Sequence, residues 1–136
     1  MTEFAATSET LKAMLARADE KLRAARVDLD AGLHGDASSR AYYGAYHAIA
    51  AVLAHAGMSF SSHAQTLGAF NREFVKPGAF PPDTFRKIQR LFEDRQIADY
   101  DWNVTIEPGT AMEDVSAAEW LVGACKEYLR SQGVEM

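Results

Sequence analysis

The sequence predicts an all-α protein, an up-and-down bundle of four main helices plus one short helix. Three observations support this fold class. Apolar residues recur at steps of three and four in every long segment, which is the period of an amphipathic helix. No segment shows the alternation typical of a strand. The segments are separated by short stretches rich in glycine and proline, which suit the tight connections between antiparallel helices.

Length and composition limit the possible classes of protein. A chain of 136 residues is expected to form one domain, residues 1–136, with its helical core at about residues 8–131. The net charge of −5 argues against a dedicated nucleic-acid coat protein but leaves room for a local basic patch. The single cysteine, Cys125, excludes an intramolecular disulfide and a cysteine-cluster zinc site. No apolar run approaches the roughly 20 residues of a membrane span, and the N-terminus lacks a signal-peptide pattern. We therefore expect a cytoplasmic protein without membrane association.

The first helix is predicted from about Ser8 to Leu33. Gly32 and Gly35 are expected to end it, and Asp36 is a suitable N-cap for the following helix. One stripe of apolar residues, with the spacing of a bundle seam, is expected to face the core: Leu11, Leu15, Ala18, Leu22, Ala25 and Leu29.

The second helix is predicted over about residues 37–55, and Gly57 ends it. It is rich in alanine and aromatic residues, so neighbouring helices can approach it closely. Its inward stripe is expected to consist of Tyr42, Ala45, Ile49, Val52 and Ala56.

Cap signals locate the remaining helices. Ser62 and Gln65 have the spacing of a capping box, which predicts a short helix as far as about Val75. The segment Pro81–Asp83 is expected to start the fourth helix. A second capping box, Thr110–Glu113, is expected to open the last helix. The apolar face of that helix carries Ala118, Leu121, Cys125 and Leu129.

The fourth helix departs from a simple apolar pattern. Its stripe of Phe85, Ile88 and Phe92 continues, at the same steps, onto Arg95 and Asp99. An exposed i,i+4 pair in this orientation would contribute no more than about 0.3–0.5 kcal/mol. Alternatively, the pair is shielded at a cleft or subunit interface, because an unpaired buried charge is costly. Spacing alone leaves both arrangements open.

A second unusual group lies on the predicted second helix. Arg40 and His47 are seven residues apart, a rise of about 10.5 Å, so they leave by the same face, which Tyr43 shares. An arginine can hold a phosphate bidentately and a histidine can transfer protons near neutral pH. The same residues could equally form a solvated helix start, with His47 hydrogen-bonded beside the core.

The other histidines suggest no metal site. His63 is in the first turn of a short helix, where the dipole is expected to keep it neutral. No H-E-x-x-H pattern, glycine-rich phosphate loop or nucleophile elbow occurs in the chain. We therefore expect neither a metal ion nor another cofactor.

Three segments closely resemble the HEPN superfamily, in its branch of small stand-alone prokaryotic proteins. They are SRAYYGAYHAIAAVLAHAG, SSHAQTLGAFNREFVKPG and FEDRQIADYD, and the resemblance extends from about Leu11 to Leu129. It implies a helical bundle that commonly forms a homodimer. It also implies a minimal nucleotidyltransferase as partner, in a toxin–antitoxin or defence pair. Active members of the superfamily are metal-independent ribonucleases that use an Arg-x4-6-His motif assembled across the dimer.

The motif can be transferred to this chain only in part. Arg95 matches the usual place of the arginine, but the segment in which the histidine is expected carries Asp99 and then Tyr100, with no histidine. Arg40 and His47 satisfy the count of an Arg-x6-His motif on the second helix.

The candidate site residues divide into two groups. The catalytic candidates are Arg40, His47 and Arg95, with binding or supporting roles for Tyr43, Asp99 and Tyr100. Two functions remain open. One is an RNA-acting protein, at its most active a metal-independent endoribonuclease. The other is a non-catalytic dimeric module that binds a nucleotide or the nucleotidyltransferase.

Overall fold

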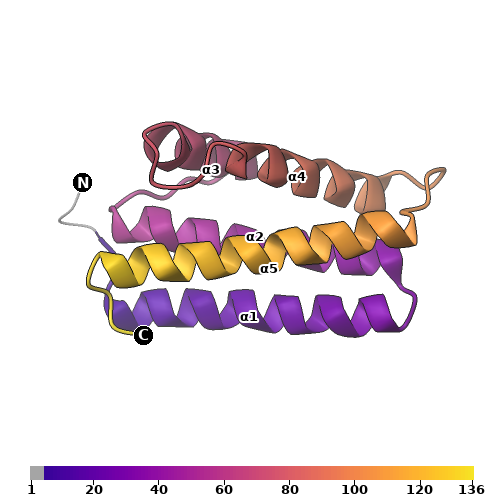
Figure 1. Ribbon diagram of the computed structural model, residues 1–136, viewed down its shortest axis with the longest axis horizontal. Helices are drawn as coiled ribbons and strands as arrows, with labels where there is room; N and C mark the ends of the chain where they lie inside the picture. The colour runs from indigo at the N-terminus through magenta and orange to yellow at the C-terminus, as the bar shows by residue number, and fades with distance from the viewer. Residues whose placement is uncertain (1–4) are drawn as a thin grey trace.

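The computed structural model describes residues 5–136, and within this range all regular secondary structure is helical, as the sequence predicts (Figure 1). The α-helices are α1 (Ser8–Asp30), α2 (His34–His55), α3 (His63–Phe70), α4 (Thr84–Tyr100) and α5 (Pro108–Ser131). A π-helical turn, Asn71–Val75, continues α3. In Figure 1 the four long helices run along the molecule, whereas α3 is seen nearly end-on and crosses them.

The first helix has the predicted inward face. Its buried residues are Leu11, Leu15, Ala18 and Ala25, with Leu22 and Leu29 partly buried against the core. The predicted connection to α2 is wrong in detail, because α1 ends at Asp30 and α2 begins at His34. Gly32 adopts a φ of 78°, a left-handed conformation that reverses the chain within a few residues. Leu33 is therefore the N-cap, and Asp36 lies in the first turn of α2.

The second helix is central to the bundle, because it packs against α1, α4 and α5. Contact on three sides explains why so many of its residues are alanine, since larger side chains would hold the neighbouring helices apart. The approach to α1 is closest at Gly44. A Cβ atom there would lie 2.9 Å from Leu22 Cδ2 and 3.3 Å from the backbone oxygen of Ala18.

The two predicted capping boxes have different outcomes. The Ser62 side chain accepts a hydrogen bond from the Gln65 backbone N–H at 3.0 Å, which confirms the first. The second is wrong, because α5 begins at Pro108, ahead of Thr110. Proline is well suited to the first position of a helix, where its fixed φ is favourable and its missing N–H has no partner to lose.

A buried polar cluster joins α2, α4 and α5. Asp114 on α5 is fully buried, and the Ser38 hydroxyl of α2 donates a hydrogen bond to its Oδ2 at 2.9 Å. Arg90 on α4 places Nε 3.6 Å from Asp114 Oδ1 and 3.7 Å from Asp94 Oδ2. Burial, and next the neighbouring Asp94, raise the pKa of Asp114 well above its usual range. The protonated carboxyl group therefore suits this position better than the carboxylate.

Candidate functional site

Arg95 on α4 is a buried cation surrounded by aromatic rings. Its side chain is only 8% exposed. Its guanidinium carbon lies 4.9 Å from the ring centre of Tyr42, 5.5 Å from Phe92, 5.6 Å from Tyr43 and 5.8 Å from Tyr100. Ring faces attract cations at such distances, which offsets part of the cost of burying the charge. The Nε atom of Arg95 is buried and has no hydrogen-bond partner.

Within residues 5–136, Asp99 is the carboxylate that forms an ion pair with Arg95. Arg95 Nη1 lies 3.7 Å from Asp99 Oδ2, and the Asp99 side chain is 27% exposed. Burial disfavours the charged guanidinium, but Tyr43, Tyr42 and Asp99 together outweigh it, so the pKa of Arg95 is raised. Arg95 is therefore a permanent cation. Of the two arrangements left open by the sequence, the structure shows shielding for Arg95 but leaves Asp99 exposed at the surface.

His63, at the start of α3, belongs to the same cluster. The Tyr42 hydroxyl lies 2.8 Å from His63 Nδ1, and the Tyr46 ring stacks on the imidazole at 4.1 Å between centres. Burial, and next the charge of Arg95, lower the pKa of His63. Burial raises the pKa of Tyr42 to about 12, so its hydroxyl remains protonated. Near neutral pH the cluster thus combines a cation, a neutral imidazole and a phenol.

Arg40 and His47 lie against α1 and do not join this cluster. Arg40 Nε is 2.9 Å from Oδ2 of Asp28, an α1 residue. His47 lines a separate cavity formed mainly with α1, and burial, then Arg17 and Lys21, lower its pKa. The structure thus brings Tyr43, Tyr100 and Asp99 around Arg95, and it leaves Arg40 and His47 on another face of α2.

Two residues of the cluster were not singled out as functional in the sequence. By sequence pattern, Tyr42 fits the core stripe of its helix, and His63 fits an ordinary first-turn position. The available signal was the crowding of three tyrosines into residues 42–46, which is more polar ring surface than a plain core requires. The pairing of this segment with a residue of α3 could not be read from spacing within one helix.

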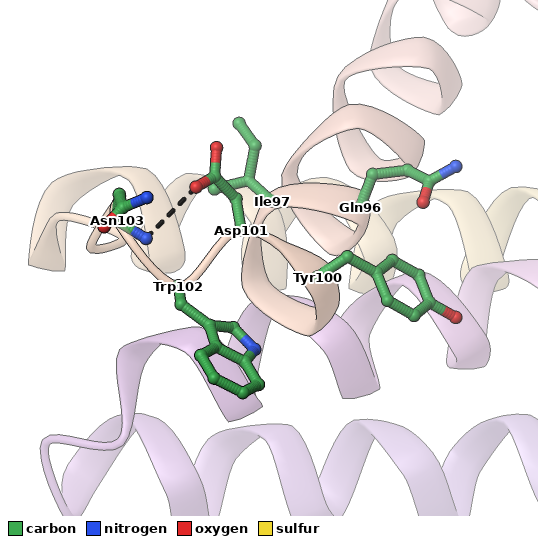
Figure 2. Close-up of a pocket in the computed structure, with 6 residues that line it drawn as sticks. All are labelled: Gln96, Ile97, Tyr100, Asp101, Trp102 and Asn103. Carbon is green, nitrogen blue, oxygen red and sulfur yellow. Dashed lines mark hydrogen bonds between the residues drawn. The ribbon is translucent and has the colours of Figure 1, made fainter.

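An open pocket of about 610 Å³ lies beside the cluster, where α4 ends and the following loop begins (Figure 2). Trp102 is 96% exposed and Tyr100 is 68% exposed, and Figure 2 shows their rings pointing in different directions from the chain. The Asn103 backbone N–H donates a hydrogen bond to Asp101 Oδ1 at 3.1 Å, which shapes the loop. This region offers exposed aromatic surface and polar groups next to a buried cation. The pocket is lined by Gln96, Ile97, Tyr100, Asp101, Trp102 and Asn103.

Within residues 5–136, no group of three or more histidine, cysteine, aspartate or glutamate side chains is arranged to hold a metal ion. None of the helices described there is both long enough and apolar enough to cross a membrane.

Comparison with known sequences defines the class of this protein. The HEPN domain matches residues 11–128, nearly the whole bundle, so the chain belongs to the HEPN domain family. A "UPF0332 protein" of Thermotoga maritima is 34% identical over 93 residues, covering 68% of this chain and 70% of the relative.

Two further relatives come from Methanocaldococcus jannaschii. One is named "Putative toxin MJ0605" and is 30% identical over 122 residues, covering 90% of each chain. The other is named "Putative toxin MJ0142" and is 25% identical over 124 residues, covering 91% of this chain and 84% of the relative.

Proposed function

We propose that this chain is an RNA-acting HEPN protein of the toxin type, in which Arg95 binds the scissile phosphate and cleavage needs no metal ion. The observation that carries the proposal is Arg95 itself. It is a buried cation with an unpartnered Nε, held by aromatic rings beside an open pocket. A guanidinium matches two phosphate oxygens at once. The relatives named as toxins support the same class.

The surroundings of Arg95 suit a phosphate that enters from the α4 end. The contact with Asp99, at 3.7 Å, is longer than a charge-assisted hydrogen bond, so a phosphate can compete for the guanidinium. A fixed cation in a poorly solvated site also stabilises the negative charge that develops on the phosphate oxygens during cleavage. The exposed rings of Tyr100 and Trp102 provide surfaces on which unpaired bases can stack. The substrate class that follows is single-stranded RNA.

The proposal includes the assembly of the protein. We expect a homodimer in the cytoplasm that pairs with a minimal nucleotidyltransferase as its antitoxin. The net charge of −5 makes general affinity for nucleic acid weak, so RNA recognition would depend on the Arg95 site.

A second candidate function is a non-catalytic module that binds a nucleotide or its nucleotidyltransferase partner. The missing histidine favours it, because positions 100–102, where the motif counted from Arg95 has a histidine, carry Tyr100, Asp101 and Trp102. An ordinary aspartate cannot donate a proton at neutral pH. Both candidates use Arg95 as the binding group. The first cuts RNA, whereas the second binds a nucleotide or its protein partner without catalysis.

The test compares wild type with Arg95→Met, which keeps the bulk among the rings and removes the guanidinium. Binding to a labelled single-stranded RNA is measured by fluorescence anisotropy, and cleavage is followed on gels with and without EDTA. We expect Arg95→Met to weaken binding roughly tenfold or more and to abolish cleavage, since charge-assisted contacts are worth about 1.5–3 kcal/mol. EDTA should have no effect.

Arg26→Met is the matched control, because it removes an arginine paired with a carboxylate, Glu119, elsewhere on the bundle. It should behave as wild type. Arg40→Met and His47→Gln test the face of α2 that lies against α1. If these variants lose cleavage while Arg95→Met cleaves RNA as well as wild type does, the proposed site is refuted. RNA binding at Arg95 without cleavage would establish the second candidate.

A further inference from the structure

We propose that His63 is the proton-transfer residue of this site and that Tyr42 is its positioning residue. The inference rests on the proposed cleavage of RNA at Arg95, and it supplies the proton-transfer group that the segment after Arg95 lacks. The spacing of residues around Arg95 on α4 does not point to His63, because His63 belongs to a different helix, α3.

The imidazole of His63 is held by rings and by one hydrogen bond. It stacks on Tyr46 at 4.1 Å and on Tyr42 at 5.7 Å, while the edge of Tyr43 is 5.9 Å away. Its Nδ1 contacts the Tyr42 hydroxyl at 2.8 Å, and its Nε2 makes no hydrogen bond with the described residues. The ring is half-buried, so Nε2 is the nitrogen left for a substrate.

Tyr42 links this imidazole to the phosphate-binding group. Its ring lies beneath the Arg95 guanidinium, at 4.9 Å, and its hydroxyl reaches His63. A phenol both donates and accepts hydrogen bonds, so Tyr42 can serve neutral His63 in either tautomer and can accept from the imidazolium. When Nδ1 carries the proton and its N–H donates a hydrogen bond to the Tyr42 hydroxyl, Nε2 has a free lone pair and can act as a base.

The charges around the cluster favour the base form before substrate binds. Burial and the charge of Arg95 both disfavour a positive charge on His63. A bound phosphate would add negative charge between the two groups and make the imidazolium more favourable. Among the other histidines, His47 lines a cavity with Arg17 on α1, and His34 and His55 are the terminal residues of α2.

The chemical step is a transesterification within the RNA. The 2′-hydroxyl gives its proton to His63 Nε2, and the 2′-oxygen forms a bond to phosphorus as the bond from phosphorus to the 5′-oxygen breaks. The leaving 5′-oxygen takes a proton from water, and His63 later releases its proton to the resulting hydroxide. The products are a 2′,3′-cyclic phosphate and a 5′-hydroxyl, with no oxidation or reduction.

The first experiment separates binding from cleavage in His63→Gln. Glutamine retains a hydrogen-bonding group for Tyr42 but cannot transfer a proton in this way. We expect RNA affinity within about threefold of wild type and cleavage reduced roughly 10²- to 10⁴-fold, the usual contribution of general acid–base catalysis. His55→Gln is the matched control and should cleave normally. Retained RNA binding also shows that the variant is folded.

Tyr42→Phe tests the positioning role. It keeps the ring beneath Arg95 and removes the hydroxyl, so we expect kcat to fall with little change in KM, and the acidic limb of the pH–rate profile to move. A residue that only supports the core would leave the pH profile in place.

A titration that does not depend on activity completes the test. By NMR, His63 should titrate below its ordinary pKa in wild type, and Arg95→Met should raise that pKa, because the neighbouring positive charge is gone. An unchanged pKa in Arg95→Met, or normal cleavage by His63→Gln, would overturn the assignment of His63 while leaving the proposed function intact. Wild-type protein that binds RNA without cutting it would refute cleavage and His63 catalysis together.

Discussion

Arg95 combines two properties that rarely occur together in a helical core, a full charge and near-complete burial. Three of its ring neighbours come from α2 or the adjacent turn of α4, and Asp99 is the only carboxylate paired with it within residues 5–136. Cation–π contacts lower the cost of burial but do not replace the hydrogen bonds that the guanidinium would make in water. An incompletely satisfied cation of this kind is better explained by ligand binding than by stability.

The contribution of Asp99 to the fold can be measured directly. Asp99→Asn leaves the buried Arg95 without a counter-charge, so we expect the free energy of unfolding to fall by about 1–3 kcal/mol, less than for a fully buried pair because Asp99 is partly exposed. Chemical denaturation measures the change. Glu127→Gln, which breaks an exposed i,i+3 pair with Arg130, is the control and should leave the denaturation midpoint unchanged. If Asp99→Asn changes the denaturation midpoint as little as Glu127→Gln does, the ion pair of Arg95 and Asp99 does not contribute to stability.

Removing the cation itself should have the opposite outcome. Arg95→Met places a flexible apolar side chain among the same rings, and replacing a buried charge in this way is often neutral or stabilising. We therefore expect a melting temperature equal to or above that of wild type. A large decrease would show that Arg95 is primarily a structural residue, and the functional argument would lose its main support.

At the scale of the elements, the cluster of Ser38, Arg90, Asp94 and Asp114 connects α4 and α5 to the central helix. Its buried carboxyl group makes the stability of this junction depend on pH. The pKa of Asp114 is raised from 3.8 to about 8 in the folded chain, so the folded state binds more protons than the unfolded state between these values.

Stability should therefore decrease as the pH rises through this window, and the loss should be complete above about pH 8. Asp114→Asn keeps a neutral group that can accept from Ser38 and contact Arg90. We expect this variant to lose much of the pH dependence and to exceed wild type in stability at pH 9. Denaturation midpoints measured from pH 5 to pH 9 test this, with Glu127→Gln retaining the wild-type slope.

The close approach of α1 and α2 gives a second prediction at this scale. Gly44 and Gly123 are both glycines within helices, but only Gly44 has no room for a Cβ atom. Gly123→Ala should stabilise the chain by about 0.5–1 kcal/mol, because alanine is the better helix former. Gly44→Ala should give no such gain or should destabilise, because Leu22 and the α1 backbone must move. Equal gains at the two positions in thermal melts would contradict the described α1–α2 packing.

At the scale of the whole molecule, the most exposed aromatic side chains among residues 5–136 lie at one end of α4 and in the loop after it. Tyr100, Trp102 and Val104 are all exposed there, and the Tyr100 ring lies 5.8 Å from the Arg95 guanidinium carbon. Exposed large apolar side chains gathered in one segment are typical of an interaction surface. The homodimer that we propose would bury part of it and would place two Arg95 sites near each other.

Sedimentation at micromolar concentration should therefore give the mass of a dimer, and Trp102→Ala should shift it toward the monomer with no loss of helical signal. Trp120→Phe is the control, because Trp120 lies on α5 beneath the Lys87 ammonium, away from this loop. It also leaves Trp102 as the single fluorescent reporter. If wild type is a monomer, or if Trp102→Ala leaves the dimer unchanged, this surface is not the dimer interface.

The features that were predicted correctly from the sequence depend on interactions between residues close together in the chain. Helix periodicity depends on neighbours three and four residues apart, so the helical bundle, the α1 stripe and the Ser62 cap could all be predicted. The predictions that failed, Asp36 and Thr110 as helix starts, concern boundaries at which Gly32 and Pro108 permit an earlier start. In both cases backbone geometry outweighed the preference of a capping side chain.

The composition of the candidate site was decided only by the tertiary structure. Arg95 and Asp99 could be flagged from their stripe, but whether that stripe faced water or α2 depended on how two helices pack. His63 approaches Arg95 because α3 crosses the bundle and brings residues 21 positions apart, Tyr42 and His63, into hydrogen-bond contact. Arg40 and His47 share a helix face by spacing, yet that face lies against α1. Periodicity determines which residues share a face of one helix, whereas packing determines what that face meets.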